Sequence, residues 1–444
     1  MSFILDKQTT DDLNLTGKFK QGSIFSHFNK VRTKGGERLL ENLFQRPLTD
    51  PAVINERSSL FSWFQQLQVD FPLDGKKFQE AENYLSMAVA TNPVVATAGN
   101  LVKKIQAQVL KGPQYEEMRS GFAAAVGLLK NCKTFFSKIN TGDNPFSKQI
   151  KQVNALFNNK HLNWLNEGID ANSLSVFKLS SYDHLLRATL KTELQSLMEI
   201  VYELDVYISV SKCAADNNYG YAKALSAEKQ VFKAEDLRHP LLKNGVGNNI
   251  SMTKDSNMVF LTGANMAGKS TLMKTIGISF FLAHLGFPVA AKNMEFSVKE
   301  GLCTSINTPD NLSLGYSHFY AEVMRVKKVA EDVAAGKNRM VIFDELFKGT
   351  NVKDAFDATH AVTESFSAFN NCFFIISTHI IEVGEALKRE CNTIQFKYLP
   401  TILEGTVPRY TYKLDDGITS DRQGMMIIEN EGILELLDQP VYQL

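Results

Sequence analysis

The stretch LTGANMAGKSTLMK, residues 261–274, decides the fold of the second half of the chain. Its residues from Gly263 to Ser270 match the pattern G-x-x-x-x-G-K-[ST]. Glycines let a backbone curl around an anion with successive N–H groups pointing inward, and a helix that begins near Lys269 adds its positive end. An apolar run precedes the stretch and a helical pattern follows it, which is the context that this motif requires. The stretch therefore predicts a phosphate-binding loop (P-loop).

This loop predicts a site for ATP and Mg²⁺. Lys269 is expected to reach the β- and γ-phosphates as a point charge, and Ser270 to offer its hydroxyl to Mg²⁺, which takes few protein ligands. The residues predicted to bind the nucleotide are Gly263, Ala264, Asn265, Met266, Ala267, Gly268, Lys269, Ser270 and Thr271.

Two further apolar runs, 340–345 and 373–378, end in polar residues that suit the same chemistry. Asp344 can hold a water of the magnesium shell, and Glu345 can orient and deprotonate the water that attacks ATP. His379 is expected to sense the γ-phosphate or that water. A helix-capping role for the two acidic residues and a structural role for the histidine are the alternatives.

A second anion-binding pattern lies at 315–322, where Gly315 and Ser317 precede a helical segment. A serine at a helix N-terminus leaves free N–H groups beside its hydroxyl. Ser317 is either an ordinary helix cap or a residue that completes the nucleotide site of another subunit.

The two halves of the chain differ in pattern. Residues 1–220 are poor in glycine, and six apolar residues spaced by three or four predict one face of a long helix: Leu190, Leu194, Leu197, Val201, Leu204 and Ile208. From residue 221 onward, the short apolar runs 258–262, 340–345 and 373–378 predict buried parallel strands. The expected helices between them span 270–285, 321–335 and 355–369. This alternation predicts an α/β domain at 221–444 after a helical domain at 1–220.

The charge balance and the cysteine content limit the kinds of partner and compartment that the sequence allows. Lysine plus arginine equals aspartate plus glutamate, so any contact with nucleic acid must depend on local charge. Residues 100–165 carry ten positive and three negative side chains, which fits either solvated helix faces or a phosphate-contacting surface. Five scattered cysteines, no signal peptide and no membrane-spanning run favour a cytoplasmic protein.

Six motifs, in order along the chain, resemble those of the MutS family of mismatch-repair ATPases, which belong to the ABC-type group. TGANMAGKSTLMK resembles TGPNMGGKST, DELFKGTN at 344–351 resembles DEIGRGTS, and STH at 377–379 matches the switch histidine. DNLSLGYSHFYAEV at 310–323, LRHPLL at 237–242 and the tail at 412–433 resemble three further family motifs. The first half resembles the family's core domain, with a shortened clamp insertion at about 85–182.

The resemblance implies a short form of the family without the mismatch-recognition and connector domains, because the core begins near Met1. The sequence departs from the family's motifs at three places. Ala267 replaces a loop glycine, and Lys348 replaces an arginine, which keeps the charge and loses the fork geometry. The stretch 245–248 lacks the aromatic residue that stacks on adenine in the family, so base preference is expected to be weaker.

The resemblance implies an ATP-gated homodimer that hydrolyses ATP, with Ser317 acting in trans, and that clamps DNA by backbone and shape instead of by mismatch reading. Repair or recombination proteins are expected partners. The alternatives are an ATP-switched protein scaffold that never holds DNA, and a nucleotide-binding module with little hydrolysis.

Overall fold

The computed structural model describes residues 2–17, 22–87, 98–100, 102, 114–139, 142–167, 174–306, 318–404, 407–419, 428 and 430–437. The chain forms two compact units. The α/β unit comprises residues 1–28, 44–58 and 214–444, and the helical unit comprises residues 29–43 and 59–213. Three of the four boundaries fall inside helices, namely α3 (Lys34–Gln45), α4 (Pro51–Leu67) and α10 (Lys191–Asp216), and the fourth follows α2 (Ile24–Phe28).

The α/β unit is built on a seven-stranded sheet with the order β1-β8-β9-β10-β5-β11-β14. The strands are β1 (Ile4–Leu5), β8 (Gly301–Ser305), β9 (Met340–Phe343), β10 (Phe373–Ser377), β5 (Met258–Gly263), β11 (Ile394–Leu399) and β14 (Asp415–Asp416). The first six are parallel, and β14 is antiparallel to β11. The three predicted apolar strands are the neighbours β9, β10 and β5, and all their residues are buried. That prediction is confirmed.

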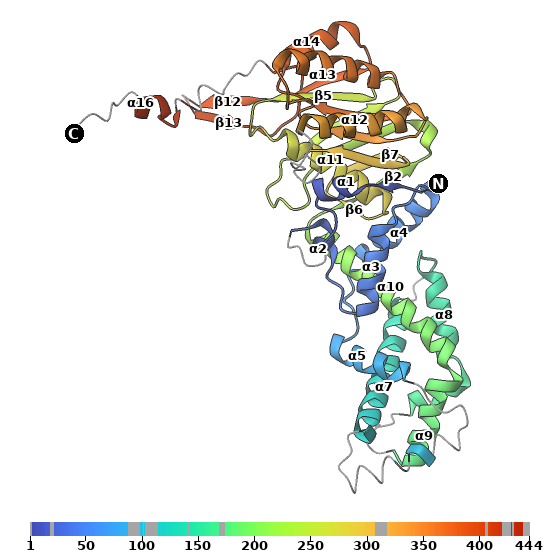
Figure 1. Cartoon of the computed structure of the whole chain (residues 1–444). Coiled ribbons are helices and arrows are strands. Elements are labelled where there is room, and N and C mark those ends of the chain that lie inside the picture. The colour runs from blue at the N-terminus through green and yellow to red at the C-terminus, as the bar shows by residue number, and fades with distance from the viewer. Residues whose placement is uncertain are drawn as a thin grey trace, which may run out of the picture. The chain divides into compact units, whose positions relative to one another are not determined.

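The three predicted helices are α11 (Lys269–His284), α12 (His318–Ala334) and α13 (Val352–Ser367), with slightly different bounds. A fourth helix, α14 (Ile381–Glu390), follows β10 and is not among those that the sequence predicts. Val326 of α12, Phe366 of α13 and Leu387 of α14 belong to one buried cluster with Phe260 and Phe374 of the sheet. Helices α12, α13 and α14 therefore each have an apolar face buried against the strands (Figure 1), which fixes the loops at the strand ends.

A second sheet of the α/β unit has the order β4-β3-β7-β2-β6. Its strands are β4 (Asn248–Thr253), β3 (Val231–Leu237), β7 (Asn293–Ser297), β2 (Gly220–Leu225) and β6 (Pro288–Val289). The remaining elements are the hairpin of β12 (Thr401–Glu404) and β13 (Val407–Tyr410), and α1 (Lys7–Asp12), α2 (Ile24–Phe28), η3 (Ala227–Lys229) and α16 (Ile433–Leu437).

The N-terminal segment packs within the α/β unit, although the sequence pattern places it in the helical domain. Strand β1 pairs with β8 at the sheet edge. Asp6 forms an ion pair with the buried Arg325, whose Nη2 donates to Thr304 O at 2.7 Å. Asp12 accepts hydrogen bonds from Thr304 Oγ1 at 2.7 Å and Ile306 N at 3.0 Å. A two-residue strand has no periodicity, so these long-range contacts give no signal in the sequence.

The helical unit contains α5 (Gly75–Ser86), α7 (Gln114–Ile139), α8 (Ser147–Phe157), η1 (Lys160–Asn166), α9 (Val176–His184) and the unit's part of α10. The six residues of the predicted stripe all lie in its buried core. The long helix that they predict is α10, which runs from Lys191 to Asp216, and a π-helical turn at Leu185–Thr189 precedes it. The proposed clamp at 85–182 includes α7, α8 and α9, and part of it lies outside the described residues. Among the described helices, none combines the length and apolarity needed to cross a membrane.

Candidate functional site: the edge of strands β5, β9 and β10

The predicted P-loop connects β5 to α11. Gly263 has φ 147° and Gly268 has φ 101°, values that side chains with a Cβ disfavour, so both glycines are needed for the turn. Met266 also has a positive φ, of 67°. Lys269 is 5% exposed, and its Nζ donates to Gly263 O at 2.8 Å and Ala264 O at 3.2 Å. Burial lowers its pKa, and the charges of two nearby carboxylates oppose that shift. The ammonium group thus lies inside the loop.

A hydroxyl–carboxylate cluster joins the loop to the ends of β9 and β10. Ser270 Oγ donates to Asp344 Oδ2 at 2.5 Å, and Ser377 Oγ donates to Asp344 Oδ1. Parallel strands bring their carboxyl ends to one edge, so residues 74 and 33 positions apart meet there. Hydroxyl and carboxylate oxygens are the donors that Mg²⁺ prefers, so Ser270 and Asp344 fit a magnesium site. Ser377 was missed, although it begins the STH motif.

Glu345 and His379 also lie together at this edge. His379 Nε2 is 2.5 Å from Glu345 Oε1, and Lys348 Nζ donates to Glu345 Oε2 at 3.1 Å. The hydrogen bond and charge of His379, aided by Lys348, outweigh burial and lower the pKa of Glu345 from 4.5 to about 2. The backbone of Glu345 is held at φ 53°, and its N–H donates to Ser377 Oγ at 3.1 Å. Such strain persists where surrounding contacts over-determine a residue, often at functional sites.

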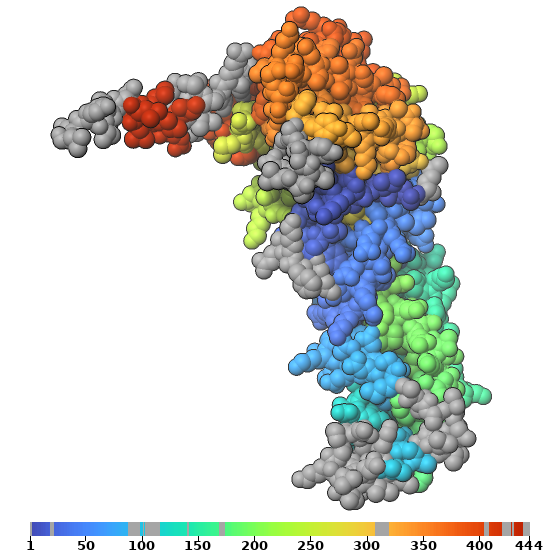
Figure 2. All heavy atoms as spheres, viewed as in Figure 1, coloured from blue at the N-terminus to red at the C-terminus, as the bar shows by residue number. Residues whose placement is uncertain are grey.

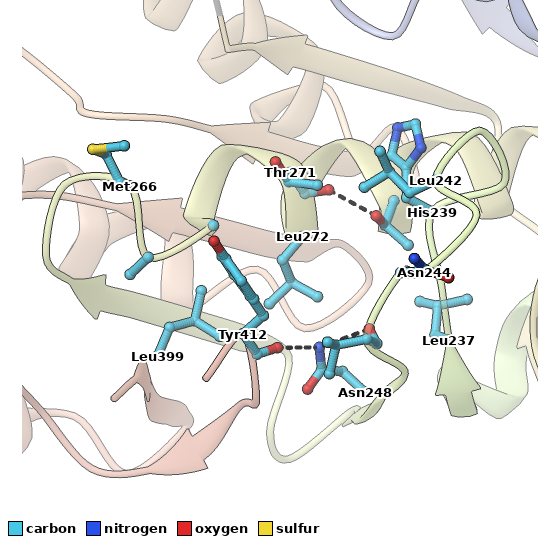
Figure 3. Close-up of a pocket in the computed structure, with 15 residues that line it drawn as sticks. Leu237, His239, Leu242, Asn244, Asn248, Met266, Thr271, Leu272, Leu399 and Tyr412 are labelled. Atoms are coloured by element: carbon cyan, nitrogen blue, oxygen red, sulfur yellow. Dashed lines mark hydrogen bonds between the residues drawn. The ribbon is translucent and has the colours of Figure 1, made fainter. Parts of the chain in front are cut away.

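A pocket of about 460 Å³ adjoins the P-loop (Figure 3). The P-loop and α11 contribute Met266, Gly268 and Thr271 to its lining. The LRHPLL stretch at 237–242 contributes His239, and the segment after β13 contributes Tyr412. The lining is mainly apolar, with a few polar groups, which is typical of a small-molecule site.

Tyr412 supplies an aromatic ring that the sequence analysis did not find. A Cβ built on Gly268 would lie 3.1 Å from Tyr412 Cδ1, so the ring lies against the loop. Asn248 fixes this segment: its Nδ2 donates to Tyr412 O at 3.0 Å, and its Oδ1 accepts from Leu414 N at 2.8 Å. The stretch 245–248 lacks an aromatic residue as noted, but the pocket that it lines contains one from elsewhere in the chain.

The GYSHFYAE motif at 315–322 extends into the start of α12. Ser317 and Gly315 lie outside the described residues, so the role predicted for Ser317 stays a prediction. Glu322, on α12, is buried and accepts a hydrogen bond from Phe347 N at 2.7 Å. It therefore supports the loop that carries Glu345 and Lys348. The GYSHFYAE motif contains Glu322, but its anchoring role has no signature in the sequence.

The basic tract at 100–165 has part of its charge at the surface of the helical unit. Lys138, Lys148, Lys151 and Lys160 are exposed. Lys133 is less exposed, and its Nζ donates to Asn166 Oδ1 at 2.7 Å. Exposed lysines on helices suit contacts with a phosphate backbone, because such contacts need charge without fixed geometry.

Comparison with known proteins gives matches over most of the chain. A family model described as MutS domain III matches residues 8–211, and one described as MutS domain V matches residues 259–437. The DNA mismatch repair protein MutS of Petrotoga mobilis (strain DSM 10674 / SJ95) is 24% identical over 398 residues, covering 81% of this chain and 48% of the relative.

The DNA mismatch repair protein MutS of Geobacillus kaustophilus (strain HTA426) is 26% identical over 246 residues, covering 54% of this chain and 27% of the relative. The chain thus spans about half or less of the length of these relatives. The two domain models occur in sequence, on the helical region and on the region of the P-loop, and the longer match runs through both. The chain belongs to the MutS family.

Proposed function

We propose that this chain is an ATP-dependent DNA-binding protein of the MutS type, with an ABC-type ATPase domain. The observation that carries the proposal is the convergence at one sheet edge of Lys269, the Ser270–Asp344 pair and the Glu345–His379 pair. A lysine within a glycine loop, a hydroxyl–carboxylate pair and an ionised carboxylate are the groups that phosphoryl transfer to water requires.

Lys269 and the loop amides would bind the β- and γ-phosphates and stabilise the charge that develops when water attacks. This requires Lys269 Nζ to exchange its two carbonyl partners for phosphate oxygens. Ser270 and Asp344 would hold Mg²⁺, which would neutralise phosphate charge when bound. The adenine would enter the adjoining pocket and stack on Tyr412.

Glu345 is the proposed base, but its present partners leave it unsuited to the task. Both carboxylate oxygens are hydrogen-bonded, and a pKa of about 2 makes the group a weak proton acceptor. We therefore propose that His379 turns from Glu345 to the γ-phosphate or to the attacking water when ATP binds. That exchange would raise the pKa of Glu345 and free an oxygen for the water.

Binding of ATP is proposed to join two copies of the chain, with Ser317 of each completing the site of the other. Hydrolysis would release them, and the helical unit would use this cycle to hold and release DNA. The exposed Lys138, Lys148, Lys151 and Lys160 suit a contact with the phosphate backbone. Such binding would weaken steeply with salt.

Two measurements on the full chain test this proposal. Lys269→Ala should lower ATP turnover at least about a hundredfold, while Lys254→Ala, which changes an exposed lysine in the turn before β5, should leave it near the parent value. Fluorescence anisotropy on duplex, mismatched and branched DNA, with and without ATP, should show salt-sensitive binding.

The outcomes separate the parts of the proposal. Equal turnover in the Lys269→Ala protein and its parent would overturn the ATPase assignment. Intact turnover without salt-sensitive binding to any of the DNA molecules would overturn the DNA-binding assignment and leave an ATP-switched scaffold.

A further inference from the structure

Three side chains away from the P-loop bring metal-ligand atoms together on two neighbouring helices. His360 and Glu364 lie one turn apart on α13, and Glu390 is the last residue of α14. One ligand atom from each side chain lies within 4.8 Å of those of the other two. His360 Nε2 and Glu390 Oε2 are 2.9 Å apart.

We propose that His360, Glu364 and Glu390 form a binding site for a transition-metal ion of the zinc class. One imidazole nitrogen and two carboxylates are a ligand set that zinc accepts, with water in the fourth position. Bonds of about 2.0–2.2 Å in a tetrahedron place the ligand atoms about 3.4 Å apart, so small side-chain movements suffice here. Mg²⁺ and Ca²⁺ prefer oxygen ligands throughout, which makes them weaker occupants of a site with an imidazole.

The surroundings favour a fixed yet accessible site. The His360 ring stacks on Phe356 of the same helix, with centroids 6.1 Å apart and an interplanar angle of 15°. Helices α13 and α14 pack side by side (Figure 1), and their residues form one orange surface in Figure 2. His360 is half-buried, whereas Glu364 is exposed and the Glu390 side chain is 51% exposed, so an ion can enter from solvent.

The position of the site connects it to the helices that follow the Glu345–His379 pair. Helix α13 begins at Val352, after the loop of Glu345 and Lys348, and α14 begins at Ile381, just after His379. A metal bridge between the two helices would stabilise their packing against each other. The site thus joins the two helices whose N-terminal ends follow the Glu345–His379 pair.

The test uses the full chain, treated with a chelator, free of nucleotide and kept in millimolar MgCl₂. Calorimetric titration with ZnCl₂ should show one ion per chain, and Zn²⁺ should raise the thermal midpoint by a few degrees because it binds only the folded state. His360→Gln and Glu390→Gln should each weaken zinc binding at least about tenfold.

Two matched variants should bind zinc like the parent. Glu385→Gln removes an exposed carboxylate of α14 outside the cluster, and Cys391→Ser removes the thiol that follows Glu390. The absence of zinc binding by the parent, or equal affinity in the His360→Gln and Glu390→Gln proteins, would overturn the proposal and reduce the cluster to an ion pair. Since no nucleotide is present, failure here would not bear on the ATPase.

Discussion

The helical unit and the α/β unit each hold a carboxylate beside a cation, but the partners differ in how firmly they are fixed. In the helical unit, Asp183 is 1% exposed, accepts from Tyr84 OH at 2.5 Å and is held by two nitrogens of Arg187, one at 2.7 Å. In the α/β unit, the side chain of Glu345 is 24% exposed, and its partners His379 and Lys348 are 40% and 56% exposed.

This difference in burial indicates that the two carboxylate–cation clusters have different roles. The Asp183 cluster has all its members buried, so none can leave without stranding a charge in the interior. The cluster therefore stabilises the fold. The partners of Glu345 reach solvent and can move to a ligand at small cost, so that cluster suits a switch. The same reasoning explains why Tyr84, buried beside the Asp183 charge, has a pKa well above its ordinary value.

The largest expected effect concerns the buried cluster around Asp183. Arg187→Met should lower the free energy of unfolding by about 3–5 kcal/mol, because it leaves Asp183 as an uncompensated buried charge. Urea unfolding of the full chain measures this change. Arg119→Met is the matched control, since the Arg119 side chain is 29% exposed and its ion-pair partner Glu116 is 68% exposed, and it should cost less than about 1 kcal/mol. Equal losses in the two variants would contradict the distinction.

A smaller effect is expected at the pocket beside the P-loop. Tyr412→Ala should weaken ATP binding about three- to tenfold, because it removes a ring that can stack on the base, whereas Tyr412→Phe should retain the parent affinity. Equilibrium titration with a fluorescent ATP analogue measures both. An unchanged dissociation constant in the Tyr412→Ala protein would show that the base lies elsewhere.

The smallest expected effect concerns acid stability. The pKa of Glu345 in the fold, about 2, lies below its ordinary value of 4.5, so its contacts stabilise the protein fully above about pH 5 and lose this effect as the pH falls toward 2. With exposed partners, the contribution is on the order of 1 kcal/mol or less. Glu345→Gln should therefore show a shallower loss of unfolding free energy in that range. Parallel curves for variant and parent would sink this assignment.

The sequence predicts the central part of the α/β unit well, because its signals are local. Apolar runs identify β5, β9 and β10, and the polar residues that end them must meet at one edge of a parallel sheet. The features that the sequence could not predict depend on contacts between residues that lie far apart along the chain. Tyr412 reaches the P-loop after β11 and a hairpin, and the two-residue strand β1 joins the sheet at residue 301. The π-helical turn before α10 is likewise invisible to a periodicity count.

The most direct test of the switch is single-turnover hydrolysis by the Glu345→Gln protein. Glutamine keeps the shape of the side chain and removes its capacity as a base, so ATP should bind within about twofold of the parent affinity while hydrolysis falls about a hundredfold. Hydrolysis at the parent rate, with binding intact, would contradict the account, because the carboxylate that His379 holds would then have no part in the reaction.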